Sequence, residues 1–239
     1  QDIYLTGNPQ ITFFKVVYRR HTNFSMEAIQ QTMNGTAAAS GSQTVTISRN
    51  GDLVHRVYLQ NVQTSQAYAE DNPGYAMFDT IELEIGGQLI DKHYSQWLDV
   101  WNELTDKDES EWIGLNKHTC KNAYLKSHTS KTNINGYQLY IPLQFWFCRN
   151  PGLALPLIAL QYHEVKVKLT TRAIHSLINT DGTTTVTEID TAPTVTLWAD
   201  YIYLDTDERR RFAQVSHEYL IEQVQRENAT ASASQKLNF

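Results

Sequence analysis

The sequence predicts an all-β protein: an eight-stranded antiparallel jelly-roll sandwich with short helices. About eight short segments alternate apolar and polar residues with the period of two that is typical of strands. Glycine-containing dipeptides separate two pairs of these segments, and long polar stretches interrupt the series. Eight short antiparallel strands with long interruptions fit a jelly roll better than a plain meander. A chain of 239 residues is long enough for one large all-β domain.

The opening segment, residues 1–22, joins an apolar stretch to a basic cluster. Asn8 supplies a helix N-cap and Pro9 a proline at the first helical position. In a strand, one face of the following residues would mix apolar and charged side chains, whereas a helix separates them. The residues of its apolar face are Ile11, Phe14, Val17 and Tyr18. We therefore predict a helix whose apolar face requires burial.

The strands are expected within residues 23–204, the predicted jelly-roll domain. Two pairs of strands flank the dipeptides Asn50-Gly51 and Gly86-Gly87, and both dipeptides predict tight hairpins because they readily adopt positive φ angles. The remaining strand segments are 23–33, 137–148, 162–172 and 194–204. The predicted long loops are 62–77, 106–137 and 176–192.

Two short helices and a further strand are also predicted. Ser95 caps a segment with Trp97, Leu98, Trp101 and Leu104 at helical spacing, which indicates an amphipathic helix laid over the sheet. Asp205 with Glu208 three residues later resembles a capping box. Residues 216–225 then alternate again. We therefore predict a linker helix and the start of a second jelly roll in residues 205–239, so that residues 23–204 are the first of two tandem jelly rolls.

Charge and composition exclude several classes of protein. A formal net charge of -6 disfavours a nucleic-acid-binding domain, which usually needs a positive field. Hydrophobic residues make up 41% of the chain and charged residues 19%, so the chain is not disordered. No apolar run reaches the roughly 18 residues that span a bilayer. Cys120 and Cys148 are too few for a disulfide scaffold and are expected to be buried thiols.

Catalytic and metal-binding patterns are weak. His118 with Cys120 lacks the second half of a zinc site. Asp79, Glu82 and Glu84 lie close together, and carboxylate pairs hydrolyse glycosides, but solvated charges on a strand beside a turn are far more common. Phosphate-binding glycine loops, nucleophile elbows and metalloprotease helices do not occur. We predict no catalytic residues, no cofactor and no metal site.

Four stretches together resemble one family, the major capsid proteins of the large icosahedral double-stranded DNA viruses. They are "YLTGNPQITFFKVVYRRHTNF", "SRNGDLV", "GGQLIDKH" and "LDTDERRRFAQVSHEYLIEQVQ". The resemblance runs from near residue 1 to about residue 225, and it implies a double jelly-roll subunit that self-assembles into pseudo-hexagonal homotrimeric capsomers. Since only the first sandwich and the entry to the second are present, we expect the sequence to be truncated, and to be clipped at its N-terminal end as well.

The resemblance also implies partners and contact residues. The implied partners are further copies of the chain, neighbouring capsomers, minor capsid proteins and, through other proteins, an internal viral membrane, with no specific nucleic acid. The implied location is the virion capsid, assembled in the host cytoplasm, and the predicted loops would form the outer tower of the capsomer. The expected assembly residues are Phe13, Phe14, Tyr18, Arg19 and Arg20. Asn34 and Asn228 are the candidate glycosylation sites, with Asn23 as a third acceptor pattern.

Three alternatives stay open. A jelly-roll carbohydrate-binding module would use Trp112, Trp146 or Trp198 to stack on sugars, although the last two fit a core better. A minor capsid paralogue would share the fold without building capsomers. A nucleic-acid-binding module would use five arginines: Arg19, Arg20, Arg209, Arg210 and Arg211.

Overall fold

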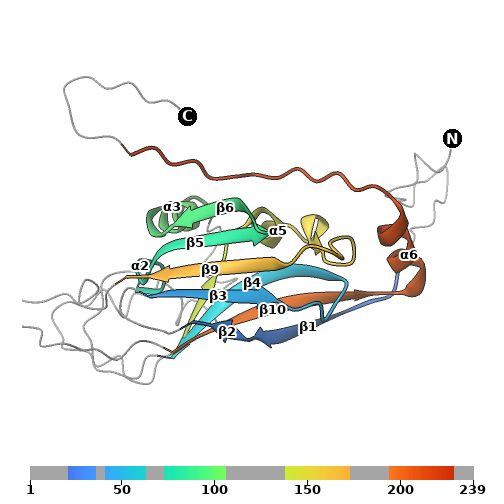
Figure 1. Cartoon of the computed structure of the whole chain (residues 1–239), viewed down its shortest axis with the longest axis horizontal. Helices are drawn as coiled ribbons and strands as arrows, with labels where there is room; N and C mark the ends of the chain where they lie inside the picture. Colours follow the sequence, from blue (N-terminus) through green and yellow to red (C-terminus); the bar gives the residue numbers. More distant parts are fainter. Residues whose placement is uncertain (1–20, 36–40, 63–72, 106–137, 173–193, 229–239) are drawn as a thin grey trace, which may run out of the picture.

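Two antiparallel sheets form a sandwich in the computed structural model (Figure 1), which describes residues 21–35, 41–62, 73–105, 138–172 and 194–228. Sheet A has the order β1 (Phe24–Gln31), β10 (Thr194–Leu204), β4 (Leu53–Val62) and β7 (Gln138–Pro142), and β8 (Leu155–Pro156) also pairs with β4. Sheet B has the order β2 (Met33–Asn34), β3 (Ser42–Ile47), β9 (Val165–Thr171), β5 (Phe78–Ile85) and β6 (Gln88–Tyr94).

The connectivity is that of a jelly roll. Apart from the two-residue strands β2 and β8, each sheet contains four strands, and the chain crosses between the sheets after β1, β3, β4, β6, β7 and β9. All pairs in both sheets are antiparallel. The predicted eight-stranded jelly-roll sandwich is therefore confirmed.

The core lies between the sheets and follows from the period-two alternation. In β9, Val165, Val167 and Leu169 are buried, while Lys166 and Lys168 between them are partly exposed. Strand β3 alternates in the same way, because successive side chains of a strand point to opposite faces. The inward side chains of β3, β4, β5 and β10 meet those of β9: Val45, Ile47, Val57, Leu59, Ile81, Leu83, Val195, Leu197, Ala199 and Tyr201.

One of the two predicted hairpins is confirmed and the other is wrong. Gly86 and Gly87 have φ angles of 61° and 81° and join β5 to β6 in a tight antiparallel hairpin. Asn50-Gly51 instead connects β3 in sheet B to β4 in sheet A, and these strands do not pair with each other. Gly51 does not have a positive φ. A Cβ at Gly51 would lie 2.8 Å from the Cβ of Tyr201, so close backbone approach requires the glycine.

Two segments predicted as strand or loop contain helices. The strand predicted over 137–148 ends at Pro142, and α5 (Trp146–Arg149) follows, with Trp146 and Phe147 buried. The predicted loop 62–77 contains α2 (Pro73–Ala76), and Tyr75 is only 2% exposed. In both places aromatic side chains enter the core from a short helix, so their burial does not require a strand.

The two predicted helices are confirmed. α3 (Ser95–Thr105) buries Leu98 and packs Trp97 against the core, although Leu104 is 75% exposed. α6 (Thr206–Gln214) has Asp205 as its N-cap, and the backbone N–H of Glu208 donates to the Asp205 side chain over 3.1 Å. A short 3-10 helix, Pro151–Leu153, follows α5. The helix predicted in residues 1–22 lies outside the described residues, apart from its last two positions.

The predicted further strand in residues 216–225 is wrong. Residues 215–228, which we call the strap, run along the outside of the sandwich above β6 and α3 without joining either sheet (Figure 1). This segment instead contacts β6 through the Gln223 side chain and the Val224 backbone N–H.

Candidate assembly surfaces

The outer faces of the two sheets differ in charge. On sheet B, lysines and glutamates form ion pairs between and along the strands. Glu82 pairs with Lys92 over 2.8 Å, Glu84 pairs with Lys168, and Glu164 pairs with Lys166 over 2.8 Å. The hydrogen bond to Glu82 raises the pKa of Lys92. These side chains pair with opposite charges of the same face. A face of this kind is stable in contact with solvent.

The outer face of sheet A is more aromatic. Tyr58 and Tyr140 lie on adjacent strands with ring centroids 6.5 Å apart, and Trp198 stands opposite Tyr58 in the neighbouring strand pair. The indole N–H of Trp198 donates to Gln60 Oε1 over 2.9 Å. Burial raises the pKa of Tyr58, and nearby Asp200 adds to this effect. This face presents apolar area with few charges, as the core of a protein interface does.

Strand β1 extends the outer face of sheet A to its edge. Ile29 and Gln31 of β1 are partly or fully buried, so the alternate residues point outward. Phe24 is 65% exposed and Met26 is 52% exposed. We call Phe24, Met26 and Ala28 the β1 patch. It is an apolar strip on an edge strand.

Helix α6 is fixed to the end of sheet A by Asp52. The Asp52 carboxylate accepts the backbone N–H of Leu204 over 2.8 Å and pairs with Arg209 of α6 over 3.0 Å. Phe212 and Leu204 pack on a second small core. This core consists of Leu53, Ala154 and Ile202. Both a charged and an apolar contact therefore orient α6, and Asp52 was not singled out from the sequence.

The strap docks on β6, α3 and α5 through several contacts. The side chain of Gln223 donates to the Ile90 carbonyl over 2.5 Å, and the backbone N–H of Val224 donates to Asp91 Oδ1 over 3.0 Å. Glu222 pairs with Arg149 over 2.5 Å. Arg149 also stacks on Trp101 of α3, with its guanidinium carbon 3.9 Å from the ring centroid. These contacts cover the edge of sheet B.

Asp91 links the strap to the buried core. The second carboxylate oxygen of Asp91 lies 2.8 Å from His93 Nε2, and both side chains are 1% exposed. His93 in turn stacks on Phe145, with ring centroids 4.7 Å apart. One oxygen of the Asp91 carboxylate thus contacts the buried His93, and the other accepts the Val224 N–H of the strap. This shared carboxylate fixes the position of the strap relative to β6.

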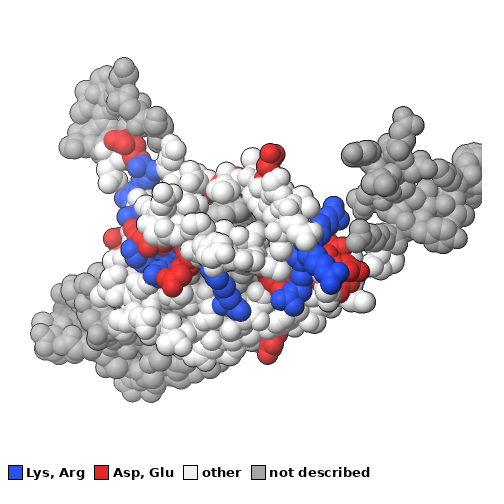
Figure 2. Space-filling view, turned by 45° about the vertical axis from the view of Figure 1, so that its right-hand side comes forward, with Lys and Arg blue, Asp and Glu red and all other residues white. Residues whose placement is uncertain are grey.

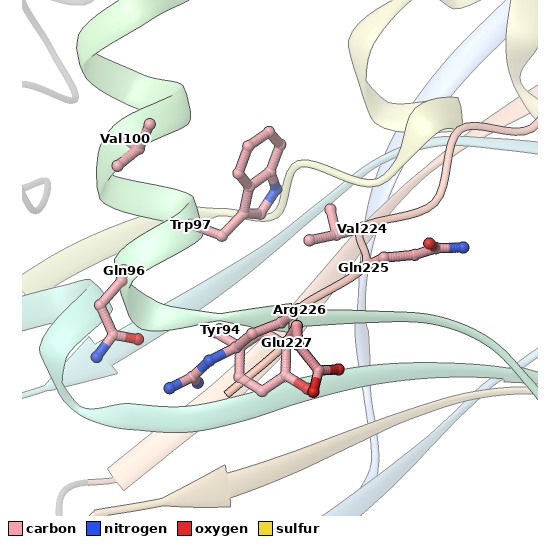
Figure 3. A pocket seen from close by; sticks show the side chains of 8 residues that line it. All are labelled: Tyr94, Gln96, Trp97, Val100, Val224, Gln225, Arg226 and Glu227. Atoms are coloured by element: carbon pink, nitrogen blue, oxygen red, sulfur yellow. The ribbon is translucent and has the colours of Figure 1, made fainter. Parts of the chain in front are cut away.

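A groove of about 490 Å³ remains between α3 and the strap (Figure 3). Its wall on the sandwich side is formed by Tyr94, Gln96, Trp97 and Val100, and its strap side by residues 224–227. The Arg226 guanidinium lies 4.5 Å from the ring centroid of Tyr94. Val100 is 50% exposed, so apolar area remains open beside this cation–π pair.

The sequence-predicted site residues fall into two groups. Phe13, Phe14, Tyr18, Arg19 and Arg20 lie outside the described residues. Asn34 and Asn228 are exposed, Asn34 at the end of β2 and Asn228 at the end of the strap. Asn23 is also exposed, just before β1. The side-chain amides of these asparagines are therefore accessible to a modifying enzyme in this part of the chain.

The weaker catalytic and sugar-binding candidates have structural partners. Asp79 lies 3.5 Å from Arg172, and Glu82 and Glu84 form the lysine pairs described above. Trp146 is 3% exposed and belongs to the core, as expected, whereas Trp198 points to the outer face of sheet A. His118, Cys120 and Trp112 lie outside the described residues.

The described part of the chain has neither a cluster of metal ligands nor a membrane-spanning helix. In residues 21–35, 41–62, 73–105, 138–172 and 194–228, no three His, Cys, Asp or Glu side chains group as metal ligands would. No described helix has the length and apolar character needed to span a bilayer. Burial raises the pKa of the Cys148 thiol to about 12, so this thiol is a poor nucleophile.

The fold and its surfaces define a class of protein: a jelly-roll module. One edge of this module is covered by the strap, and the other carries the apolar β1 patch. The sequence profile of a family described as "Major capsid protein N-terminus" matches residues 12–205. The chain belongs to this family. The family resemblance expected from the four sequence stretches is thereby confirmed.

Curated relatives and a solved structure agree with this assignment. The chain is 53% identical to the "Major capsid protein" of Pyramimonas orientalis virus over its whole length, which covers 59% of that relative. It is 44% identical to the "Major capsid protein" of Paramecium bursaria Chlorella virus 1, covering 98% of the chain and 53% of the relative. A solved structure titled "PBCV-1 virus capsid, quasi-atomic model" superposes with a TM-score of 0.73 at 42% identity. This match covers 90% of the chain and 50% of that structure's chain, so the chain spans about half the length of the proteins it matches.

Proposed function

We propose that the chain is the first jelly roll of a structural major capsid protein of a large icosahedral double-stranded DNA virus. One observation carries the proposal: relatives called major capsid protein match the chain from end to end, at identities of up to 53%. The described geometry supports it. Carboxylates that were candidates for catalysis are ion-paired, and what distinguishes the module is its surface, which suits self-association better than chemistry on a substrate.

The assembly unit is a pseudo-hexagonal homotrimer of double jelly rolls. Two tandem sandwiches per subunit give six per trimer, and the half-length coverage of the relatives leaves room for a second sandwich after residue 228. In this proposal residues 1–22 are an N-terminal segment, residues 23–204 the first jelly roll and residues 205–239 the linker and the start of the second. Phe13, Phe14, Tyr18, Arg19 and Arg20 remain predicted assembly residues.

Apolar contact area is the expected source of the assembly free energy. Burial of apolar surface contributes roughly 25 cal/mol per Å², and stable interfaces bury about 1,600 Å² in total. In a closed symmetric assembly the symmetry repeats each contact. The assembly is therefore stable even though each single interface has only a modest binding free energy. The partners are therefore other copies, neighbouring capsomers and minor capsid proteins.

The setting of the proposed function is the virion. We place assembly in the host cytoplasm, with contact to an internal membrane only through other proteins, and without a cofactor, a metal or a specific nucleic acid. Asn34 and Asn228 are the proposed glycosylation sites because both are exposed and both occur in acceptor tripeptides.

The mass of the native protein tests the proposal. The intact polypeptide is measured under denaturing conditions, and the native assembly is measured in solution. We expect a polypeptide about twice the length of this sequence that assembles as a trimer. A polypeptide of this length that stays monomeric at high concentration would contradict the capsomer and favour a minor capsid paralogue.

A further inference from the structure

Among the described residues, strand β1 is an edge strand without the usual protection. It pairs with β10 in unbroken register from Phe24 to Gln31, and β1 ends the strand order of sheet A. Natural proteins protect such edges with lysines, prolines, bulges or a covering segment. The eight residues of β1, FSMEAIQQ, contain no lysine and no proline, and Glu27 is their one charge. The edge is therefore suited to contact with another protein surface.

The β1 patch adds apolar area to this edge. Phe24 and Met26 occupy alternate positions, and both point away from the core with more than half of their surface exposed. Single exposed apolar residues are common on protein surfaces. Two large apolar side chains that are neighbours on an edge strand are less common. Aromatic residues and methionine are also enriched in protein interfaces.

The opposite edge of the sandwich is covered by the strap. The strap contacts Ile90 and Asp91 on β6, the last strand of sheet B. β6 lies on the same side as β7, because His93 of β6 stacks on Phe145, which follows β7 closely. β1 and β2 lie on the other side, separated by a single residue. In Figure 1 the strap runs along the top and β1 lies at the bottom.

The strap therefore carries the chain away from β1. Asn228, the last residue that the structure describes, follows the groove that α3 and the strap form on the β6 side. In the proposed double jelly roll, a second sandwich joined beyond the strap would lie nearer the β6 side than the β1 side of the first sandwich. We therefore assign the β1 side to a different molecule.

We propose that the β1 patch and the outer edge of β1 contact a second copy of this chain. This inference rests on the proposed function and adds the location of one subunit contact. The contact is heterologous: the β1 side of one copy meets a different surface of its neighbour, which is the kind of contact that closes into rings and trimers. Phe24 and Met26 are the apolar residues at its centre.

A charge at Met26 tests the contact in the full-length polypeptide. We expect Met26→Lys to weaken trimer formation about tenfold or more, because a lysine ammonium would be desolvated in an apolar interface. Tyr162→Lys is the matched control, since Tyr162 is 93% exposed and lies outside the β1 patch. The control should assemble as the wild type does. Native mass at several concentrations gives the trimer affinity, and a thermal melt checks that both variants fold.

A photocrosslinking amino acid at Phe24 identifies the partner. We expect it to join two copies of the chain, giving a species of twice the subunit mass. Crosslinking only within one chain, to residues 1–20 for example, would overturn the inference, and so would Met26→Lys assembling with unchanged affinity. If either result is obtained while the wild-type protein still forms a trimer, the proposed function is not affected. A wild-type protein that stays monomeric would overturn both.

Discussion

The glycine at position 51 shows how one residue determines the crossing between the two sheets. Position 51 lies where β3 of sheet B gives way to β4 of sheet A, and the backbone there passes against the side chain of Tyr201. The Tyr201 hydroxyl donates to the Ser48 carbonyl over 2.6 Å. The ring therefore cannot move aside without losing this hydrogen bond, and no side chain larger than hydrogen fits at Gly51.

Gly51→Ala should destabilise the fold by about 1–3 kcal/mol, the usual cost of overpacking a dense core. The added Cβ would lie 2.8 Å from the Tyr201 Cβ, an atom fixed by the backbone. Gly152→Ala is the control, because the nearest atom to its new Cβ would be an exposed side-chain oxygen 3.3 Å away. Its effect should stay within about 0.5 kcal/mol. Urea denaturation of both variants gives the two free energies of unfolding, and equal values would contradict the steric argument.

At the scale of elements, α6 depends on a contact that no pattern around it reveals. Asp205 caps the helix, but Asp52, more than 150 residues away in sequence, holds it against sheet A through Arg209 and Leu204. A nine-residue helix is marginal without tertiary contacts. The docked position of α6 therefore depends on Asp52 and on the packing of Phe212.

Asp52→Ala should release α6 from the sheet. It removes the ion pair with Arg209 and leaves the backbone N–H of Leu204 without its acceptor, at a cost of about 1–3 kcal/mol. Trypsin should then cleave faster at Arg209, Arg210 and Arg211, because proteolysis requires local unfolding of the helix. Asp207→Ala serves as the control, since Asp207 is an exposed residue of the same first turn. If both variants are cleaved at the same rate, Asp52 does not hold the helix.

Strands such as β3 and β9 could be predicted from the sequence because their apolar and polar residues alternate with a period of two, as their burial does. Elements that reach the core without this alternation, such as short helices, could not be predicted in this way. In α5, aromatic residues fill the core from one helical turn, and the run "FWFC" reads as a continuing strand. Gly86-Gly87 and Asn50-Gly51 are equivalent as local signals, but only the first has positive φ. The second needs glycine for a contact with Tyr201, which is 150 positions further along the chain.

The same limit applies to the candidate surfaces. The β1 segment was predicted as a strand, but its place at the edge of sheet A depends on which strands pair, and pairing is a property of the whole fold. The alternation in residues 219–224 signalled a strand, whereas the segment contacts β6 through the Gln223 side chain and the Val224 backbone N–H without joining the sheet. Partner-dependent features of this kind have no local sequence signature.

At the scale of the whole molecule, acidic and basic side chains are mixed on the surface (Figure 2). Basic and acidic side chains lie near one another in several places, with broad uncharged areas between them (Figure 2). Arg209 pairs with Asp52 and Arg149 with Glu222. On the face that Figure 2 shows, the described residues form no extended positive surface of the kind that binds a phosphate backbone, and the net charge of the sequence is -6.

The protein should therefore show no retention on immobilised double-stranded DNA, even at low salt. Low ionic strength is the strictest condition, because the Debye length is then longest and weak attraction between exposed charges is strongest. Arg210 and Arg211 are exposed on α6, but Asp207 and Glu208 stand in the first turn of the same helix and offset their field. Retention that falls steeply as salt rises would contradict this expectation. If the double variant Arg210→Gln with Arg211→Gln then lost this retention, the DNA-binding surface would be assigned to α6. The module would in that case have a nucleic-acid contact in addition to the β1 patch.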